Sequence, residues 1–279
     1  MFDLEGIRKI AEIANPRNPG DYEKDGLLYC HKCNTPKQCR CELPWKSFIA
    51  PCMCQCETEK YNREKEEKAE AERLDAIKNL RVNGINDTSV RSMTFDVDDR
   101  RDAKKSDLAR RYVSKWSQLY RENVGLLFYG NTGNGKTFTA ACIANALIDM
   151  KVPVLMTSFS KIIKQVSGMR AEDKIEYLNS INRYDLLILD DLGAERESQY
   201  ALEIVYDVVD SRYKSGKPMI ITTNLTMAEM KNPISMDYQR IYDRILEMCM
   251  QIHFEGESRR KDKAKDKLAK ARDILLSSD

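Results

Sequence analysis

GNTGNGKT, at residues 130–137, decides the fold of this chain. Two glycines with four residues between them, followed at once by Lys and Thr, form the P-loop pattern, in which backbone N–H groups of a tight loop converge on phosphate oxygens. The apolar run GLLFY at 125–129 has strand character, and residues 138–150 carry apolar side chains at helical spacing. Because a strand precedes the loop and a helix follows it, the pattern indicates a nucleotide-binding site rather than a glycine-rich surface turn.

The P-loop pattern predicts a role for individual side chains. We expect Lys136 to hold the β- and γ-phosphates of ATP and the Thr137 hydroxyl to ligate Mg²⁺. The positive N-terminal end of the following helix adds to the attraction for phosphate. Phe95, upstream, is interpreted either as a surface for the adenine base or as a core residue. The residues predicted to bind the nucleotide are Gly130, Asn131, Thr132, Gly133, Asn134, Gly135, Lys136, Thr137 and Phe138.

The run DLLILDD at 185–191 is the second landmark. A buried apolar strand that ends in two acids places carboxylates at the C-terminal edge of a parallel sheet, beside the P-loop. We expect Asp190 to hold Mg²⁺, mostly through water, and Asp191 to polarise the attacking water. An ordinary strand-end turn can also carry two acids, but the spacing of about fifty residues from the P-loop favours a Walker B motif.

Polar residues further along extend the predicted catalytic set. Residues 218–224 have the pattern of another strand, and Asn224 at its end is placed to orient the water or sense the γ-phosphate. Arg240 and Arg244 lie four apart on a predicted helix, which puts two guanidinium groups on one face. Arginines of this kind often act on the nucleotide of a neighbouring subunit.

Seven of the nine cysteines lie between Cys30 and Cys56. A Cys-x-x-Cys pair followed about twenty residues later by a second cysteine group is the spacing of structural zinc. Disulfides are the alternative, and an intracellular ATPase argues against them. The predicted zinc ligands are Cys30, Cys33, Cys54 and Cys56, with Cys52 as the nearest substitute and Cys39 and Cys41 as further alternatives.

Composition divides the 279 residues into four predicted parts. These are a zinc-binding domain at 1–56, a charged helical linker at 57–90 with a turn at Asn83-Gly84, an ATPase domain at 91–260 and a basic tail at 261–279. The net charge of +2 requires nucleic-acid contacts to come from local patches. No apolar run approaches the roughly 20 residues that cross a bilayer, so we expect a cytoplasmic protein without a membrane partner.

Five motifs together resemble the AAA+ ATPases of the DnaC and DnaI kind, which are bacterial helicase loaders, and their relatives, the IstB transposition helpers. They are GNTGNGKT, LLILDDLGAE at 186–195, TTN at 222–224, RIYDRI at 240–245 and GESRR at 256–260. The resemblance covers roughly residues 90–260, and the cysteine module looks like the N-terminal zinc domain of DnaI-type loaders. It implies an α/β AAA+ P-loop NTPase with a parallel sheet flanked by helices. Only about 35 residues follow Arg244, too few for a full lid domain.

The resemblance also implies a function. The zinc domain would grip the hexameric replicative DNA helicase, and the AAA+ domain would self-associate, bind ATP and single-stranded DNA and hydrolyse ATP slowly. Arg244 would be the trans-acting finger and Arg260 the second sensor arginine, with Arg240 and Arg259 as the competing choices. Lys161, Lys164 and Arg170 fall in the insertion with which this family contacts DNA. The predicted catalytic residues are Lys136, Asp190, Asp191, Asn224, Arg244 and Arg260, and the predicted cofactors are ATP, Mg²⁺ and Zn²⁺.

Two alternatives stay open. The first is an IstB-like transposition helper, against which the cysteine module counts because those proteins typically lack it. The second is a non-hydrolysing adaptor or inhibitor that binds the helicase. Intact Lys136, Thr137, Asp190 and Asn224 weigh against a dead nucleotide site.

Overall fold

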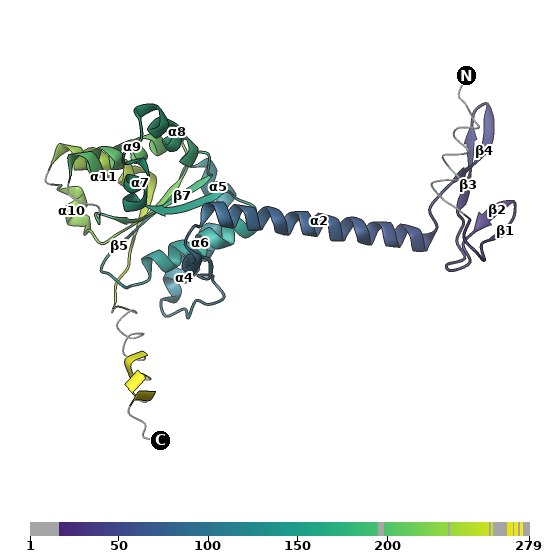
Figure 1. Ribbon diagram of the computed structural model, residues 1–279, viewed down its shortest axis with the longest axis horizontal. Coiled ribbons are helices and arrows are strands. Elements are labelled where there is room, and N and C mark those ends of the chain that lie inside the picture. The colour runs from purple at the N-terminus through teal and green to yellow at the C-terminus, as the bar shows by residue number, and fades with distance from the viewer. Residues whose placement is uncertain are drawn as a thin grey trace. The chain divides into compact units, whose positions relative to one another are not determined.

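The computed structural model divides the chain into two compact units, Met1–Asp75 and Ala76–Asp279 (Figure 1). It describes residues 17–194, 198–233, 235–256, 258, 267–269, 271–272 and 274–275. Over these residues, no helix combines the length and the apolar character that a membrane span needs.

Two short antiparallel hairpins build the first unit. They are formed by β1 (Tyr22–Lys24) with β2 (Leu27–Tyr29) and by β3 (Gln38–Leu43) with β4 (Lys46–Pro51). The centre of the unit is polar, because the fully buried Lys37 ammonium lies 3.2 Å from Asp21 and 3.3 Å from Glu57. Its ion pairs join the residue before β3 to the first turn of the following helix, α2 (Gln55–Gly84). A unit with so few buried apolar side chains needs another source of folding free energy.

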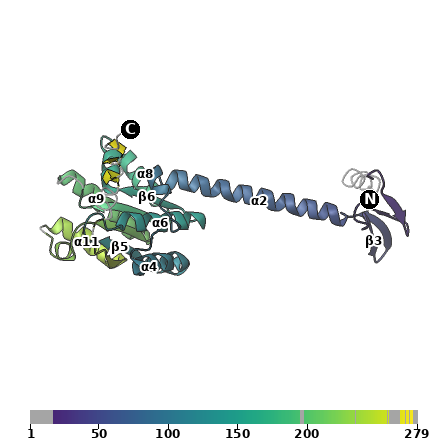
Figure 2. The ribbon, with the colours of Figure 1, turned by 90° about the horizontal axis from the view of Figure 1, so that it is seen from below.

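The charged run predicted as a helix forms α2, which is mostly exposed and has Ile77 and Gly84 as its buried residues. The turn predicted at Asn83-Gly84 is wrong, because α2 continues through Gly84. A Cβ atom at Gly84 would lie 1.9 Å from the Val154 carbonyl oxygen, so glycine allows the helix to end against the next layer. Figure 2 shows this end of α2 beside β6, where Ile85 forms a bridge with Met156.

A five-stranded parallel sheet organises the second unit and confirms the predicted fold. Its strands are β5 (Gly125–Tyr129), β6 (Val154–Ser158), β7 (Leu186–Leu192), β8 (Met219–Thr223) and β9 (Cys249–His253). Their order is β6-β7-β8-β5-β9, so the strand before the P-loop and the strand with the paired acids flank β8. The carboxyl ends of parallel strands meet at one edge, which is where ligands bind in such sheets.

Helices cover both faces of this sheet (Figure 1). They are α3 (Thr88–Arg91), α4 (Ala103–Ser114), α5 (Trp116–Arg121), α6 (Lys136–Asp149), α7 (Phe159–Val166), α8 (Ala171–Ile181), α9 (Gln199–Ser215), α10 (Met227–Lys231) and α11 (Met236–Met248). Side chains of α4, α5 and α6 pack on one face, and those of α7 to α11 pack on the other.

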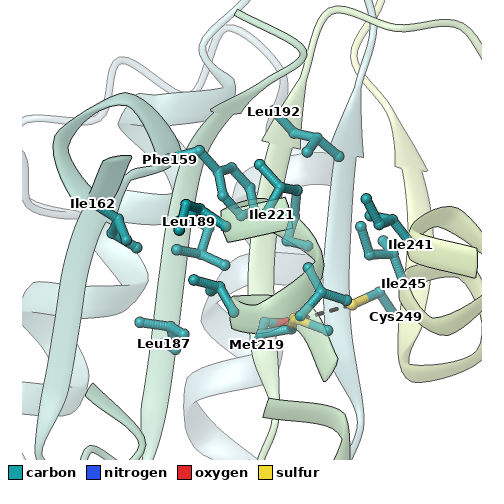
Figure 3. Close-up of a cluster of buried hydrophobic side chains, with 14 of the residues drawn as sticks. Phe159, Ile162, Leu187, Leu189, Leu192, Met219, Ile221, Ile241, Ile245 and Cys249 are labelled. Atoms are coloured by element: carbon teal, nitrogen blue, oxygen red, sulfur yellow. Dashed lines mark hydrogen bonds between the residues drawn. The ribbon is translucent and has the colours of Figure 1, made fainter. Parts of the chain in front are cut away.

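Strand residues alternate between the two cores. Leu126 and Phe128 join the cluster under α6, whereas Leu127 joins the cluster under α9 and α11. Figure 3 shows the second cluster, with Leu189 and Ile221 beside Phe159. Because both faces are buried, the start of β7 at 186–189 and residues 126–128 of β5 are continuous apolar runs. Each fully buried aliphatic side chain contributes about 1.5–3 kcal/mol.

Candidate functional site

The P-loop connects β5 to α6 through a tight turn. Gly130 has φ +129° and Gly133 has φ +85°, in the region that favours glycine. A Cβ at Gly130 would lie 2.3 Å from the Phe254 carbonyl oxygen, and one at Gly133 would lie 2.0 Å from the Ser258 hydroxyl oxygen. The chain after β9 therefore backs directly onto the loop, and larger residues would push the two segments apart.

Lys136 is directed into the loop. Its side chain is almost fully buried, and its ammonium donates to the carbonyl oxygens of Gly130 at 2.7 Å and Asn131 at 2.8 Å. It also donates to Oδ1 of Asn224 at 2.9 Å, which lies just past β8. The cation and the amide thus lie together at the sheet edge. A phosphate there would meet a buried positive charge and a polar partner, so ATP fits this cradle.

Asp190 lies on β7 and contacts Thr137 at the end of the P-loop. Its Oδ1 accepts from the Thr137 hydroxyl at 2.8 Å and from the Thr222 hydroxyl at 2.6 Å. Burial raises the pKa of Asp190, and these two hydrogen bonds oppose that rise. A carboxylate beside a hydroxyl provides the hard oxygen ligands that Mg²⁺ prefers.

Asp191 lies one residue further and has an exposed side chain. Its φ of +57° and the shifted register between β7 and β8 mark a bulge. The backbone N–H of Asp191 donates to the Thr222 hydroxyl at 3.0 Å. The sequence predicted both acids at the sheet edge but gave no indication of this bulge.

A hollow beside the start of α6 combines aromatic and polar walls. Phe95, Asn134, Phe138 and Phe254 are among its lining residues. The Arg110 guanidinium lies 4.6 Å from the centre of the Phe95 ring. Flat aromatic faces next to a phosphate cradle suit a nucleotide base. Phe254 was missed at the sequence level because its position depends on β9 reaching the P-loop.

Four of the seven cysteines of the first unit converge. The four predicted ligands, Cys30, Cys33, Cys54 and Cys56, have sulfur atoms that all lie within 4.8 Å of one another. Cys56 is 3.7 Å from Cys30 and 3.4 Å from Cys54, measured between the sulfur atoms. Zinc bonds of about 2.3 Å place tetrahedral thiolates about 3.8 Å apart, so the donor set fits zinc. The alternatives Cys39, Cys41 and Cys52 lie outside this group.

One of the predicted zinc ligands, Cys33, is also shifted toward its thiolate form. The Thr35 hydroxyl, 3.0 Å from the sulfur, lowers the pKa of the Cys33 thiol to about 5. The thiolate is the form of cysteine that binds metals. Asp21 and His31 approach Cys30 as well, and they are paired with each other at 3.1 Å.

Comparison with known proteins places the chain in a family. The family model described as IstB-like ATP binding protein matches residues 56–267. The chain belongs to the IstB-like ATP-binding family. The match spans α2 and the whole sheet, so the P-loop of this IstB-like protein lies in the part that the family shares.

Two curated relatives are similar to this IstB-like chain. The replicative helicase loader DnaI of Bacillus subtilis is 26% identical over 163 residues, which are 53% of this chain and 52% of DnaI. The replicative helicase loader DnaC of Escherichia coli K12 is 31% identical over 143 residues, 49% of this chain and 55% of DnaC. The chain therefore spans about half the length of each of these relatives.

A solved structure also matches. The crystal structure of DnaI aligns with a TM-score of 0.53 and 25% identity, and the alignment covers 62% of this chain and 94% of that one. This match supports the assignment of the fold.

The predicted arginines of this IstB-like protein lie in different surroundings. Arg244 is held on α11 by an ion pair of 2.7 Å with Asp210 of α9, and its guanidinium lies 4.9 Å from the Tyr206 ring centre. Arg240, one turn earlier, is exposed and makes no ion pair with any residue that the structure describes. Arg259 and Arg260 lie outside the described residues.

The predicted DNA contacts are on the surface. Lys161 and Lys164 lie on α7, and Arg170 immediately precedes α8, where it pairs with Asp173 at 3.1 Å. All three side chains are exposed.

Proposed function

We propose that this chain is an ATP-dependent loader of the replicative DNA helicase onto single-stranded DNA. The observation that carries the proposal is a nucleotide cradle, with Lys136, Thr137, Asp190 and Asn224 at one sheet edge, in a chain similar to two proteins named as replicative helicase loaders. Its ATP turnover is slow and stimulated by DNA or by the helicase.

Each residue of the cradle has a role in this proposal. Lys136 binds the β- and γ-phosphates, and Thr137 and Asp190 hold Mg²⁺, which neutralises phosphate charge when bound. Asp191 polarises the attacking water, and Asn224 orients it. The hollow at Phe95 and Phe254 takes the base.

The zinc unit is the proposed grip on the helicase. Four thiolates bind one zinc ion, and metal binding contributes most of the folding free energy of this small unit. Apolar side chains gather on the β3–β4 hairpin, where Trp45 in the turn is 80% exposed and Ile49 is 51% exposed. Exposed apolar groups of this kind mark interaction surfaces. DNA contacts are assigned to Lys161, Lys164 and Arg170 as phosphate-binding side chains.

Helicase capture by the full chain tests the proposed grip. Trp45→Ser should weaken capture of the replicative helicase at least tenfold, because exposed Trp side chains dominate interface energies. Met236→Ser is the matched control, since Met236 is 71% exposed but lies on α11 in the other unit. Equal capture of the helicase by the two variants would show that the β3–β4 hairpin is not part of the interface.

The transposition-helper alternative keeps one observation in its favour, which is the IstB-like family itself. It requires an ATPase that responds to DNA but does not capture the helicase. The adaptor alternative requires helicase capture without ATP turnover. Both quantities measured on the same full-length preparation distinguish the three hypotheses.

A further inference from the structure

The end of β7 departs from regular strand geometry where the site needs it. Leu189 pairs with Ile221 and Leu192 pairs with Thr223, so two residues, Asp190 and Asp191, face the single residue Thr222. In a regular strand, neighbouring side chains point to opposite faces of the sheet. The bulge interrupts that alternation, and Asp191 adopts φ +57° with its side chain exposed.

The hydroxyl of Thr222 joins both acids. It donates to Oδ1 of Asp190 at 2.6 Å and accepts from the backbone N–H of Asp191 at 3.0 Å. A threonine hydroxyl has one donor and two acceptor positions, so both bonds form at once. The Thr222 side chain is fully buried, which leaves no water to replace either bond.

We infer that Thr222 is a positioning residue for both Walker B carboxylates: its hydroxyl fixes Asp190 against Thr137 and holds the bulge that carries Asp191 to the surface. This inference rests on the proposed nucleotide function. Thr222 does not touch the nucleotide itself, and it acts through the two acids. Both hydroxyl bonds go to Oδ1 of Asp190, and the carboxylate fixed in this way would supply oxygen to Mg²⁺.

Removing the hydroxyl takes away a contact to each acid. Oδ1 of Asp190 is left with the Thr137 hydroxyl as its donor, and the backbone N–H of Asp191 loses its acceptor. Both carboxylates are then held less firmly at the sheet edge.

Three substitutions in the full chain test the inference. Thr222→Val keeps the shape and removes the hydroxyl, and Thr222→Ser restores the hydroxyl. Thr223→Val is the matched control, because Thr223 is equally buried and its hydroxyl bonds Leu192 and Leu225 rather than the acids.

We expect Thr222→Val to raise the Mg²⁺ concentration for half-maximal ATP turnover about 10–100-fold, the usual effect of losing an outer-shell partner. Thr222→Ser should return this concentration toward wild type, and Thr223→Val should leave it unchanged. Equal effects of the two valine variants, or no recovery with serine, would overturn the inference.

A second measurement separates this inference from the proposed function. Hydrogen exchange of the Asp191 backbone amide, measured by NMR without nucleotide, reports its bond to the Thr222 hydroxyl. Faster exchange in Thr222→Val than in Thr223→Val supports the positioning role even if the wild type hydrolyses no ATP. Unchanged exchange would remove the role, whatever the turnover.

Discussion

At the scale of single residues, Asp190 is a carboxyl group whose pKa is raised by burial. As a result, the folded protein holds the Asp190 proton more tightly than the unfolded chain does. Its contribution to stability is therefore favourable at low pH and is lost as the pH rises through the folded pKa. Above the folded pKa, the ionised carboxylate destabilises the nucleotide-free protein.

Asp190→Asn should therefore stabilise the protein and, at the same time, remove the proposed Mg²⁺ site. We expect the free energy of unfolding of the Mg²⁺-free protein at pH 7 to rise by about 1 kcal/mol, with loss of Mg²⁺-dependent ATP turnover. The amide oxygen can still accept from Thr137 and Thr222. Calorimetry of the zinc-loaded protein without Mg²⁺ or nucleotide measures the change, and a lower melting temperature would contradict this account of the burial.

At the scale of elements, Arg244 connects α11 to α9. The guanidinium pairs with Asp210 and lies 4.9 Å from the Tyr206 ring centre and 5.6 Å from the Tyr213 ring centre. Arg244→Ala should lower the free energy of unfolding by about 1–3 kcal/mol. If Arg244 is also the trans-acting finger, the same variant should lose stimulated turnover by a factor of about 10³ or more.

Asp210→Asn separates the two roles of Arg244, because it weakens the same ion pair and keeps the guanidinium. We expect it to retain stimulated turnover at a reduced melting temperature. Equal loss of turnover in Arg244→Ala and Asp210→Asn would make Arg244 a structural residue only. Loss of stimulated turnover in Arg240→Ala would instead identify Arg240, the exposed arginine of α11, as the trans-acting arginine.

The cysteine unit makes a prediction about metal content. Cys54→Ser should reduce zinc from about one ion per chain toward zero, because Cys54 contributes one of four converging thiols. Cys52→Ser should leave the zinc content unchanged, since Cys52 lies outside that group. Metal analysis of the purified full chain gives both numbers. Equal loss in the two variants would mean that the ligand set is wrong.

Elements with local signals were the ones predictable from sequence. The run 186–189 is apolar throughout because the sheet is covered on both faces, and GNTGNGKT encodes the loop in consecutive residues. Features that depend on distant partners were not predictable. The role of the Thr222 hydroxyl depends on the bulge of β7. The ion pair between Arg244 and Asp210 depends on the packing of α9 against α11. Glycine at 84 suggested a turn, but it serves close approach to Val154.

At the scale of the whole molecule, the proposed function assigns different tasks to the two units. The first unit carries the thiol cluster and the exposed hairpin, and the second carries the phosphate cradle. A loader needs both, because capture of the helicase without ATP control delivers nothing to DNA. The two tasks should therefore be separable by substitution within the full chain.

The most direct measurement is transfer of the replicative helicase onto circular single-stranded DNA, which has no end for threading. The account predicts that the wild-type chain with ATP and Mg²⁺ deposits helicase on the circles. Lys136→Ala should still capture helicase but deposit none, because its phosphate cradle lacks the buried cation. Equal deposition of helicase with and without the wild-type chain would contradict the central claim.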